Sequence, residues 1–352
     1  MKKISKSRKF AIATIVIAAI ISSIKVYYDA TAENRKNKTI ESVESLRKLN
    51  EECMTRTADE NLKHGELKDF GEKNIITFKN FSSRNSLKGV CLGIAQFEAL
   101  NYMDKLKDLN IDMNGEKIKF TEQLDLSKYV MNEDECSKIY PQDRSQDFNY
   151  PEGRKKLSST EVYESYYNNL PLEDFRNKIK NEDISKILNS INYLQRNSKI
   201  IVWHMKRIKP YYYLGLSSHL KYSINNMTIT KPRLKPKYIT DKIDNNMPVV
   251  LSFGEKGSGH AVLGYKYEYL DQNTLKVYVV DSNFPKIRID EEKYKTFNEE
   301  IKTNFFVLLN RKDKHSRWDY IYCPIVNGQD VYVNYNSYLA ETSFNIFEVD
   351  VD

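Results

Sequence analysis

The chain has 352 residues, of which 40% are hydrophobic, 12% aromatic and 29% charged, and its formal net charge is +7. This composition is typical of a folded protein with a sizeable core, and it excludes an intrinsically disordered chain. Four cysteines without a C-x-x-C spacing exclude a disulfide-stapled scaffold, and they argue against a structural zinc site or a redox dithiol.

The first 32 residues have the pattern of a targeting segment. Residues 1–9 carry five positive charges and no acid, residues 10–24 are uncharged and rich in Ile and Ala, and an A-x-A site lies at residues 30–32. This pattern predicts a cleaved secretory signal peptide. The alternative is an uncleaved signal anchor over residues 10–28, which approaches the ~20 residues that a spanning helix needs. Both predict that the rest of the chain is exported, either secreted or anchored to the outer face of the membrane.

Most of the excess positive charge lies in this segment. Residues 1–32 hold six of the 55 basic residues and one of the 48 acidic residues, which leaves 49 basic against 47 acidic residues, a net charge of +2. The charge of the whole chain is therefore no argument for a nucleic-acid partner, and we expect none.

The next segment, residues 33–77, is polar and charged. Ile40, Val43, Leu46 and Leu49 in its first part are at helical spacing. We interpret it as a stalk or a short prosegment, and we expect the main folded domain over residues 78–352.

The main domain divides into a helical half and a half rich in strands. Apolar spacing predicts helices over residues 92–106 and 172–193. Enrichment in β-branched and aromatic residues predicts five strands, at residues 249–253, 261–269, 275–280, 305–309 and 321–325. Helices followed by antiparallel strands predict an α+β fold.

Cys91 lies directly before the helical pattern of residues 92–106. A cysteine at a helix N-terminus is close to the positive end of the helix dipole and to unpaired backbone N–H groups. Both favour the thiolate, which is the nucleophilic form. Gly89 and Gly93 flank the cysteine, and we expect them to keep its sulfur accessible. The alternative interpretation is a small buried cysteine that opens a core helix.

His260 follows the glycine-rich residues 254–259 and opens a predicted strand, a position that suits a general base beside a flexible loop. Asp281 and Asn283 come directly after the next strand. If these two strands pair antiparallel, either residue could hold one imidazole nitrogen and leave the other for Cys91. The alternatives are a strand-end histidine bonded to backbone, and a plain turn over Asp-Ser-Asn-Phe-Pro.

Three short sequence segments together resemble the papain-like cysteine peptidases, especially bacterial secreted and effector-type members. They are GVCLGIA around Cys91, GHAVLGY around His260 and VYVVDSNFP around Asp281. The resemblance implies a papain-like catalytic domain over residues 78–352 with a C-terminal β extension. In that fold a central helix carrying the Cys packs against an antiparallel β-sheet carrying the His and the Asp or Asn.

The resemblance also implies a role for each residue. Cys91 is the expected nucleophile, His260 the general base and Asp281 the orienter, with Asn283 as the alternative orienter. Asn85, six residues before the Cys, stands where the family has its oxyanion-hole amide, which is usually Gln. The backbone N–H of Cys91 is the expected second donor. The implied reaction is hydrolysis of peptide or amide bonds in a peptide or protein substrate through a thioester acyl-enzyme.

No cofactor is expected. The reaction needs no metal, and the other histidines do not have the spacing of a ligand set. These histidines are His64, His204, His219 and His315. Two alternatives stay open: a catalytically inactive papain-like protein with a binding or structural role at the cell surface, or another Cys/His acyl-transfer enzyme. A transglutaminase-like protein and a cell-wall amidase are examples of the second, and the long Cys91-to-His260 separation and the absence of His-x-Trp argue against both.

A basic stretch over residues 199–237 is the last notable feature. It contains nine Lys or Arg and no Asp or Glu, interleaved with Trp203 and the three tyrosines from Tyr211 to Tyr213. Such a stretch can bind an anionic membrane or an anionic cell-wall surface. Basic and aromatic residues can also bind nucleic acid, but export makes that the least suitable ligand. The alternative is a solvated face with ordinary aromatic packing.

Overall fold

The structure of the chain is a computed structural model. It describes residues 40–58, 60–81, 89–113, 116–139, 174–197, 236–255, 258–284, 304–326, 329–330, 335–336 and 343–347. The expected leader, Asn85 and residues 199–235 of the basic stretch lie outside this part. The chain divides into two compact units, Met1–Glu52 and Cys53–Asp352, and the described residues of the first unit are helical. None of the described helices is long and apolar enough to cross a membrane.

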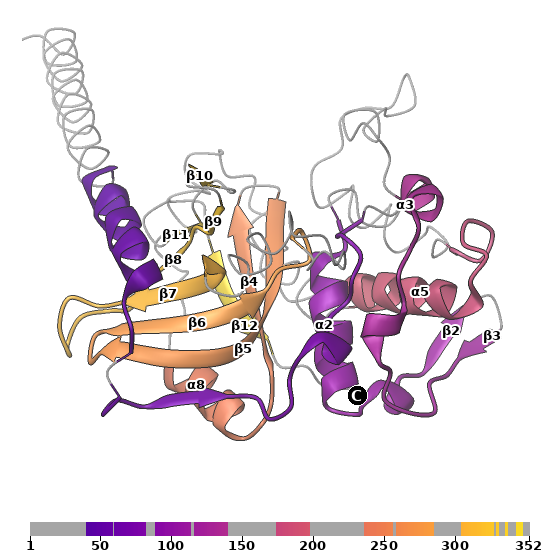
Figure 1. Ribbon diagram of the computed structural model, residues 1–352, viewed down its shortest axis with the longest axis horizontal. Helices are drawn as coiled ribbons and strands as arrows, with labels where there is room; N and C mark the ends of the chain where they lie inside the picture. The colour runs from indigo at the N-terminus through magenta and orange to yellow at the C-terminus, as the bar shows by residue number, and fades with distance from the viewer. Residues whose placement is uncertain are drawn as a thin grey trace, which may run out of the picture. The chain divides into compact units, whose positions relative to one another are not determined.

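An eight-stranded antiparallel sheet dominates the second unit (Figure 1). Its strand order is β11-β8-β7-β6-β5-β4-β12, and β1 pairs with the distal half of β5. The strands are β1 (His64–Glu66), β4 (Val249–Glu255), β5 (Ser258–Asp271), β6 (Thr274–Val280), β7 (Phe306–Asn310), β8 (Asp319–Tyr322), β11 (Tyr335–Asn336) and β12 (Ser343–Phe347). Two short hairpins accompany the sheet: β2 (Ile111–Met113) with β3 (Glu116–Ile118), and β9 (Ile325–Val326) with β10 (Gln329–Asp330).

The central strands bury side chains on both faces of the sheet. On one face, Leu251 of β4 and Val262 of β5 belong to a large apolar cluster. On the other face, Val250 and Leu263 belong to a second cluster that includes the first turns of helix α2 (Cys91–Tyr102). A strand that is buried on both faces is a continuous apolar run in the sequence, as in Val249 to Leu251.

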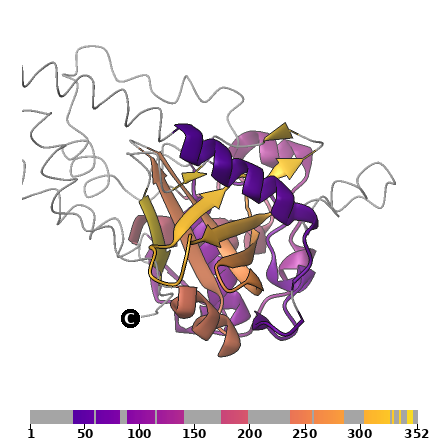
Figure 2. The same ribbon diagram turned by 90° about the vertical axis from the view of Figure 1, so that its left-hand side faces the viewer.

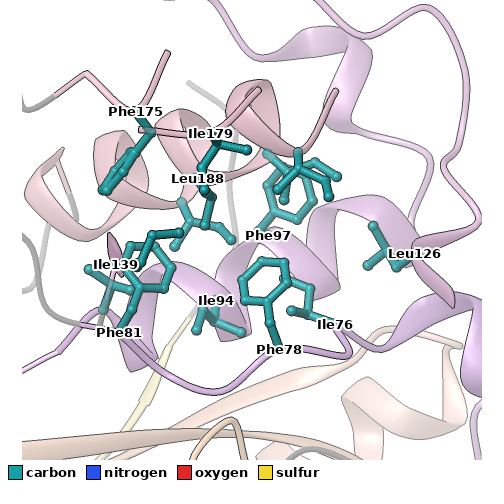
Figure 3. Packing of buried hydrophobic residues seen from close by; sticks show 14 of the residues in the cluster. Ile76, Phe78, Phe81, Ile94, Phe97, Leu126, Ile139, Phe175, Ile179 and Leu188 are labelled. Atoms are coloured by element: carbon teal, nitrogen blue, oxygen red, sulfur yellow. The ribbon is translucent and has the colours of Figure 1, made fainter. Parts of the chain in front are cut away.

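Helix α2 lies between the sheet and the helical part of the second unit. Nearly all its residues are buried, and its apolar residues occupy every face, as expected of a central helix. Ala95 and Ala99 pack towards the sheet beside Val250. Ile94 and Phe97 pack on the opposite side, in the cluster that Figure 3 shows. The helix that begins with Cys91 is therefore held from both sides.

The helical part completes the second unit (Figure 1 and Figure 2). Its helices are α3 (Glu133–Ile139), α5 (Glu182–Asn197), and the short 3-10 helices η1 (Glu72–Asn74), η2 (Leu106–Asp108) and η3 (Leu126–Lys128). Helix α8 (Pro236–Asp244) packs instead with the sheet, through Ile239 and Ile243. Gly93 lets α5 approach α2 closely, because a Cβ at Gly93 would overlap the carbonyl oxygen of Ile191.

The α+β prediction is confirmed, and strands lie at all five predicted places, with the last prediction divided between β8 and β9. One predicted helix is too long, because α5 begins at Glu182 and not at residue 172. Asn181 caps it by accepting hydrogen bonds from two backbone N–H groups of its first turn. Phe175 and Ile179 precede the cap and are buried in the same core. Their spacing therefore reflects burial, and not a helix.

One other boundary differs from the prediction. The helix predicted to reach residue 106 ends at Tyr102, after which Asp104 has a positive φ of 55°. Within residues 33–77, which we interpret as a stalk or prosegment, β1 is part of the sheet and Ile76 is part of the core. A three-residue strand is too short to show a period in the sequence, so β1 left no periodic signal.

Candidate active site

Cys91 is the first residue of α2, and its side chain is only 8% exposed. The first backbone N–H groups of a helix have no intrahelical acceptor, so they can stabilise negative charge at this sulfur. The N-cap residue, Val90, donates its N–H to Oδ1 of Asn80 at 2.8 Å and to the carbonyl oxygen of Phe81 at 3.0 Å. Gly93 donates its N–H to Oε1 of Gln195 on α5 at 2.9 Å.

His260 lies near the start of β5 and is buried. Its Nε2 is 2.9 Å from Oδ1 of Asp281. The side chain of Cys91 is close enough to the ring to contribute to the raised pKa of His260. Because Nε2 faces Asp281, Nδ1 is the nitrogen left for the sulfur. The structure therefore brings Cys91, His260 and Asp281 together in one connected line.

The pairing of the strands explains why these residues meet. In the β4–β5 hairpin Phe253 is opposite His260, and in the β5–β6 hairpin Leu263 is opposite Val280. His260 therefore lies near one end of β5, and Asp281, one residue beyond β6, lies at the same end of the sheet. Helix α2 packs on β4 and β5 and brings Cys91 to this end.

Asp281 accepts hydrogen bonds at both carboxylate oxygens and is fully buried. Oδ1 accepts from His260 and, at 2.8 Å, from the backbone N–H of Asn283, while Oδ2 accepts from the hydroxyl of Tyr322 at 2.5 Å. The orienting contact with the ring thus comes from Asp281. Asn283, the alternative orienter, directs its side-chain oxygen to Nδ2 of Asn80 at 2.9 Å.

The electrostatics favour an ion pair between His260 and Asp281. Burial alone would lower the pKa of His260, but the charge and hydrogen bond of Asp281, together with the contact with Cys91, outweigh it and raise the pKa from 6.5 to about 10. Burial would raise the pKa of Asp281, but the charge and hydrogen bond of His260, then Tyr322 and the Asn283 N–H, lower it below 3.8. The ring is therefore an imidazolium near neutral pH.

Aromatic rings surround the ion pair on the side of the sheet. The ring of Tyr322 lies 6.5 Å from that of His260 at an interplanar angle of 20°, and 5.0 Å from that of Phe253 at 8°. Tyr335 of β11 stacks against Phe253 at 5.4 Å. These rings shield the hydrogen bond between His260 and Asp281 from water, which strengthens it.

Glu98 is a second buried carboxyl close to the site. It lies on α2, two turns after Cys91, and its Oε1 accepts a hydrogen bond from the backbone N–H of Ile76 at 2.9 Å. Burial raises the pKa of Glu98 from 4.5 to about 8; the Ile76 hydrogen bond opposes this shift, and the negative charge of Asp281 adds to it. Glu98 is therefore neutral at pH 7.

Sequence reasoning missed four residues that contact or support the site: Asn80, Glu98, Gln195 and Tyr322. None lies in a motif. The polar type of Asn80 and Glu98 inside apolar surroundings was the only signal that could have found them. Asn85, the expected oxyanion-hole amide, lies outside the described residues.

The described part of the chain contains no group of three or more His, Cys, Asp or Glu side chains that could hold a metal ion. None of the four cysteines, all of which are described, is in a disulfide. No protein-family model, no characterised protein and no solved structure matches the chain. The chemistry of the site is therefore inferred from its geometry.

Proposed function

We propose that the chain is an exported cysteine peptidase or amidase of the papain-like kind. Cys91 is the nucleophile, His260 the acid and base, and Asp281 the orienter. The observation that carries the proposal is the buried His260–Asp281 pair with the side chain of Cys91 beside the imidazole. A thiol at a helix start, an imidazole and a carboxylate in this order are the groups that acyl transfer requires.

The charge state of the site supports the same chemistry. A pKa of about 10 for His260 makes the ring an imidazolium at neutral pH, and an imidazolium in contact with Cys91 stabilises the thiolate. Asp281 holds the ring by Nε2, so the Nδ1 proton faces the sulfur. A thiolate next to a proton donor is ready to attack a carbonyl and to protonate the leaving group.

The reaction proceeds in two halves. The Cys91 thiolate attacks the carbonyl carbon of the scissile amide, forming a C–S bond and an oxyanion. The imidazolium of His260 gives its Nδ1 proton to the amide nitrogen, the C–N bond breaks, and the amine leaves. Water then gives a proton to Nδ1 and attacks the thioester carbonyl. The C–S bond breaks and the carboxylic acid product leaves.

The oxyanion needs hydrogen-bond donors within the site. We propose the backbone N–H of Cys91 as one donor, because it belongs to the first turn of α2. We retain Asn85 as the proposed second donor. Its removal, by Asn85→Ala, should lower kcat far more than it raises KM, because the oxyanion exists only after attack.

The papain-like assignment has support from the packing. Helix α2, which carries Cys91, packs on β4 and β5, and His260 and Asp281 lie at one end of the same antiparallel sheet. This packing supports the arrangement that the sequence resemblance implies. An inactive binding protein with this fold, and a transglutaminase-like or cell-wall amidase enzyme, are the outcomes that the experiment below separates from it.

The experiment is hydrolysis of a mixed peptide library, followed by mass spectrometry of the products. Wild-type protein should cleave peptides and Cys91→Ala should not, while Cys136→Ala, a half-buried cysteine on α3, should cleave as wild type does. Parallel reactions contain an amine donor or peptidoglycan. Incorporation of the amine would indicate a transglutaminase-like enzyme, and cleavage of peptidoglycan alone a cell-wall amidase. No reaction with any substrate would favour the inactive binding protein.

We propose that the protein acts outside the cell. The support is the pattern of residues 1–32, and mass spectrometry of the N-terminus in the medium and in the membrane fraction tests it. The basic stretch over residues 199–237 is a proposed contact with an anionic membrane or cell-wall surface. Vesicles with and without anionic lipid, at low and high salt, test this contact, and absence of binding at low salt would remove it.

A further inference from the structure

Asn80 connects the segment before Cys91 to the turn after Asp281. Its side chain is buried and uses both ends of the carboxamide. Oδ1 accepts from the backbone N–H of Val90 at 2.8 Å, and Nδ2 donates to Oδ1 of Asn283 at 2.9 Å. The backbone N–H of Asn80 also donates to the carbonyl oxygen of Ser282 at 2.7 Å.

These contacts join the two halves of the proposed site. Val90 is the N-cap of α2, directly before Cys91, so the Oδ1 contact fixes the start of the helix that carries the nucleophile. Asn283 donates its backbone N–H to the carboxylate of Asp281, so the Nδ2 contact fixes the turn that holds the orienter. A single side chain therefore spans the distance between nucleophile and ion pair.

Gly89, two residues before α2, leaves space for the Asn80 side chain. Gly89 has a φ of +122°, a conformation that residues other than glycine rarely adopt. A Cβ at Gly89 would lie 2.6 Å from Nδ2 and 3.0 Å from Oδ1 of Asn80. Both the backbone conformation and the missing side chain of Gly89 thus leave room for the Asn80 carboxamide.

We propose that Asn80 is a positioning residue that sets the separation between Cys91 and the His260–Asp281 pair. The inference rests on the proposed function, in which His260 activates Cys91. A carboxamide suits this role because it donates and accepts at once, whereas a carboxylate or an aliphatic side chain of the same size can do only one or neither. Displacement of reacting groups by about 1 Å can cost on the order of 100-fold in rate.

The test is the rate at which iodoacetamide alkylates Cys91 between pH 5 and 9, because this rate needs no knowledge of the substrate. Asn80→Ala should lower the rate near neutral pH by about 10-fold or more and change its pH profile. The matched control is Asn101→Ala, at the other end of α2. Asn101 is equally buried, and its carboxamide also makes two hydrogen bonds, to the N–H and carbonyl of Leu124. This control should lose thermal stability but keep the alkylation rate within about 2-fold of wild type.

A second variant tests the hydrogen bond between Asn80 and Asn283. Asn283→Ala removes the same hydrogen bond from its half-buried end, and it is the variant to use where Asn80→Ala does not fold. Because Asn80→Ala already removes the hydrogen bond that Asn283→Ala breaks, the double variant should react no more slowly than Asn80→Ala alone. If the alkylation rate of the double variant falls by the product of the two single-variant reductions, the proposed role of the Asn80–Asn283 hydrogen bond is overturned. A folded Asn80→Ala or Asn283→Ala protein that is alkylated at the wild-type rate would also overturn it.

His260→Ala separates this inference from the proposed function. If His260→Ala slows the alkylation and Asn80→Ala does not, the positioning role fails and the Cys–His pair stands. If His260→Ala leaves the rate unchanged, the proposed function fails, and the positioning role fails with it.

Discussion

The hydroxyl of Tyr322 donates a hydrogen bond to Oδ2 of Asp281, the carboxylate oxygen that His260 does not use. Tyr322 is the last residue of β8, which is separated from β5 and β6 by β7 in the sheet. The carboxylate is thereby fixed from two sides, by the imidazole at one oxygen and by the phenol at the other. The side chain whose ring shields the ion pair from water therefore also supplies the hydrogen bond at Oδ2.

Tyr322→Phe keeps the ring stacked on Phe253 and removes only the hydroxyl. One oxygen of a buried carboxylate then loses its hydrogen bond, which costs roughly 1–3 kcal/mol. We expect the kcat of peptide hydrolysis to fall by about 10-fold with little change in KM. The acid limb of the pH–rate profile should shift to higher pH, because Asp281 loses a contact that lowers its pKa. The control is Tyr269→Phe, near the far end of β5. Equal losses in both variants would contradict a specific role for the Tyr322 hydroxyl.

The ion pair should make stability depend on pH in a defined window. The pKa of His260 is raised from 6.5 to about 10, so its stabilisation is complete below pH 6.5 and is lost as the pH rises through about 10. The pKa of Asp281 is lowered from 3.8, so its stabilisation is present above pH 3.8 and is lost as the pH falls through its folded-state value. The pair therefore contributes most between these two limits.

The measurement is urea unfolding of wild type and His260→Gln between pH 5 and 10. The difference in their free energies of unfolding should be largest near pH 5–6 and should shrink by a few kcal/mol, on the order of 3–4, towards pH 10. A difference that is independent of pH would contradict an ionised His260 in the folded state.

Glu98→Gln should stabilise the protein at alkaline pH. Gln retains an acceptor for the N–H of Ile76 but cannot ionise. The pKa of Glu98 is raised from 4.5 to about 8, so the folded state holds the proton more tightly and wild-type stability falls as the pH rises from 4.5 to 8. Relative to wild type, the variant should gain on the order of 4 kcal/mol between pH 4.5 and pH 9. Glu122→Gln, at an exposed glutamate, is the charge-matched control and should show no such gain.

Gly93→Ala should destabilise the contact between α2 and α5. Alanine in a helix is favoured over glycine by about 1 kcal/mol. Here, however, the added Cβ would overlap the carbonyl oxygen of Ile191 and lie 3.0 Å from the backbone nitrogen of Gln195. Because these are backbone atoms, we expect a net loss of about 2 kcal/mol or more in the free energy of unfolding. Gly71→Ala is the control, since a Cβ there meets nothing within 4 Å, and equal stability of the two variants would contradict the close approach.

Much of the site could be predicted because its parts lie at the ends of elements that are local in sequence. Cys91 begins a helix with a clear apolar period, and His260 and Asp281 lie at the same end of two consecutive strands. Hairpin neighbours pair with each other, so the meeting of the two residues follows from chain order. The fold class followed from the same order of helices and strands.

The residues that support the site could not be predicted, because they reach it from distant elements. Tyr322, which contacts Asp281, lies on β8, 41 residues after it. Gln195, which contacts Gly93, lies on α5, 102 residues after it. Such contacts depend on the order of strands in the sheet and on helix packing, which leave no period in the sequence. Asn80 lies in no motif, and its role depends on the turn at Asn283.

The most direct test of the central claim is competition among the cysteines for a limiting amount of iodoacetamide at neutral pH. Cys136 is more exposed than Cys91, which is only 8% exposed, so accessibility alone favours alkylation of Cys136. Activation by His260 favours Cys91. Mass spectrometry of the modified peptides should find Cys91 labelled first in wild type, and this preference should disappear in His260→Ala. Labelling of Cys136 before Cys91 in the folded wild-type protein would contradict the proposed nucleophile.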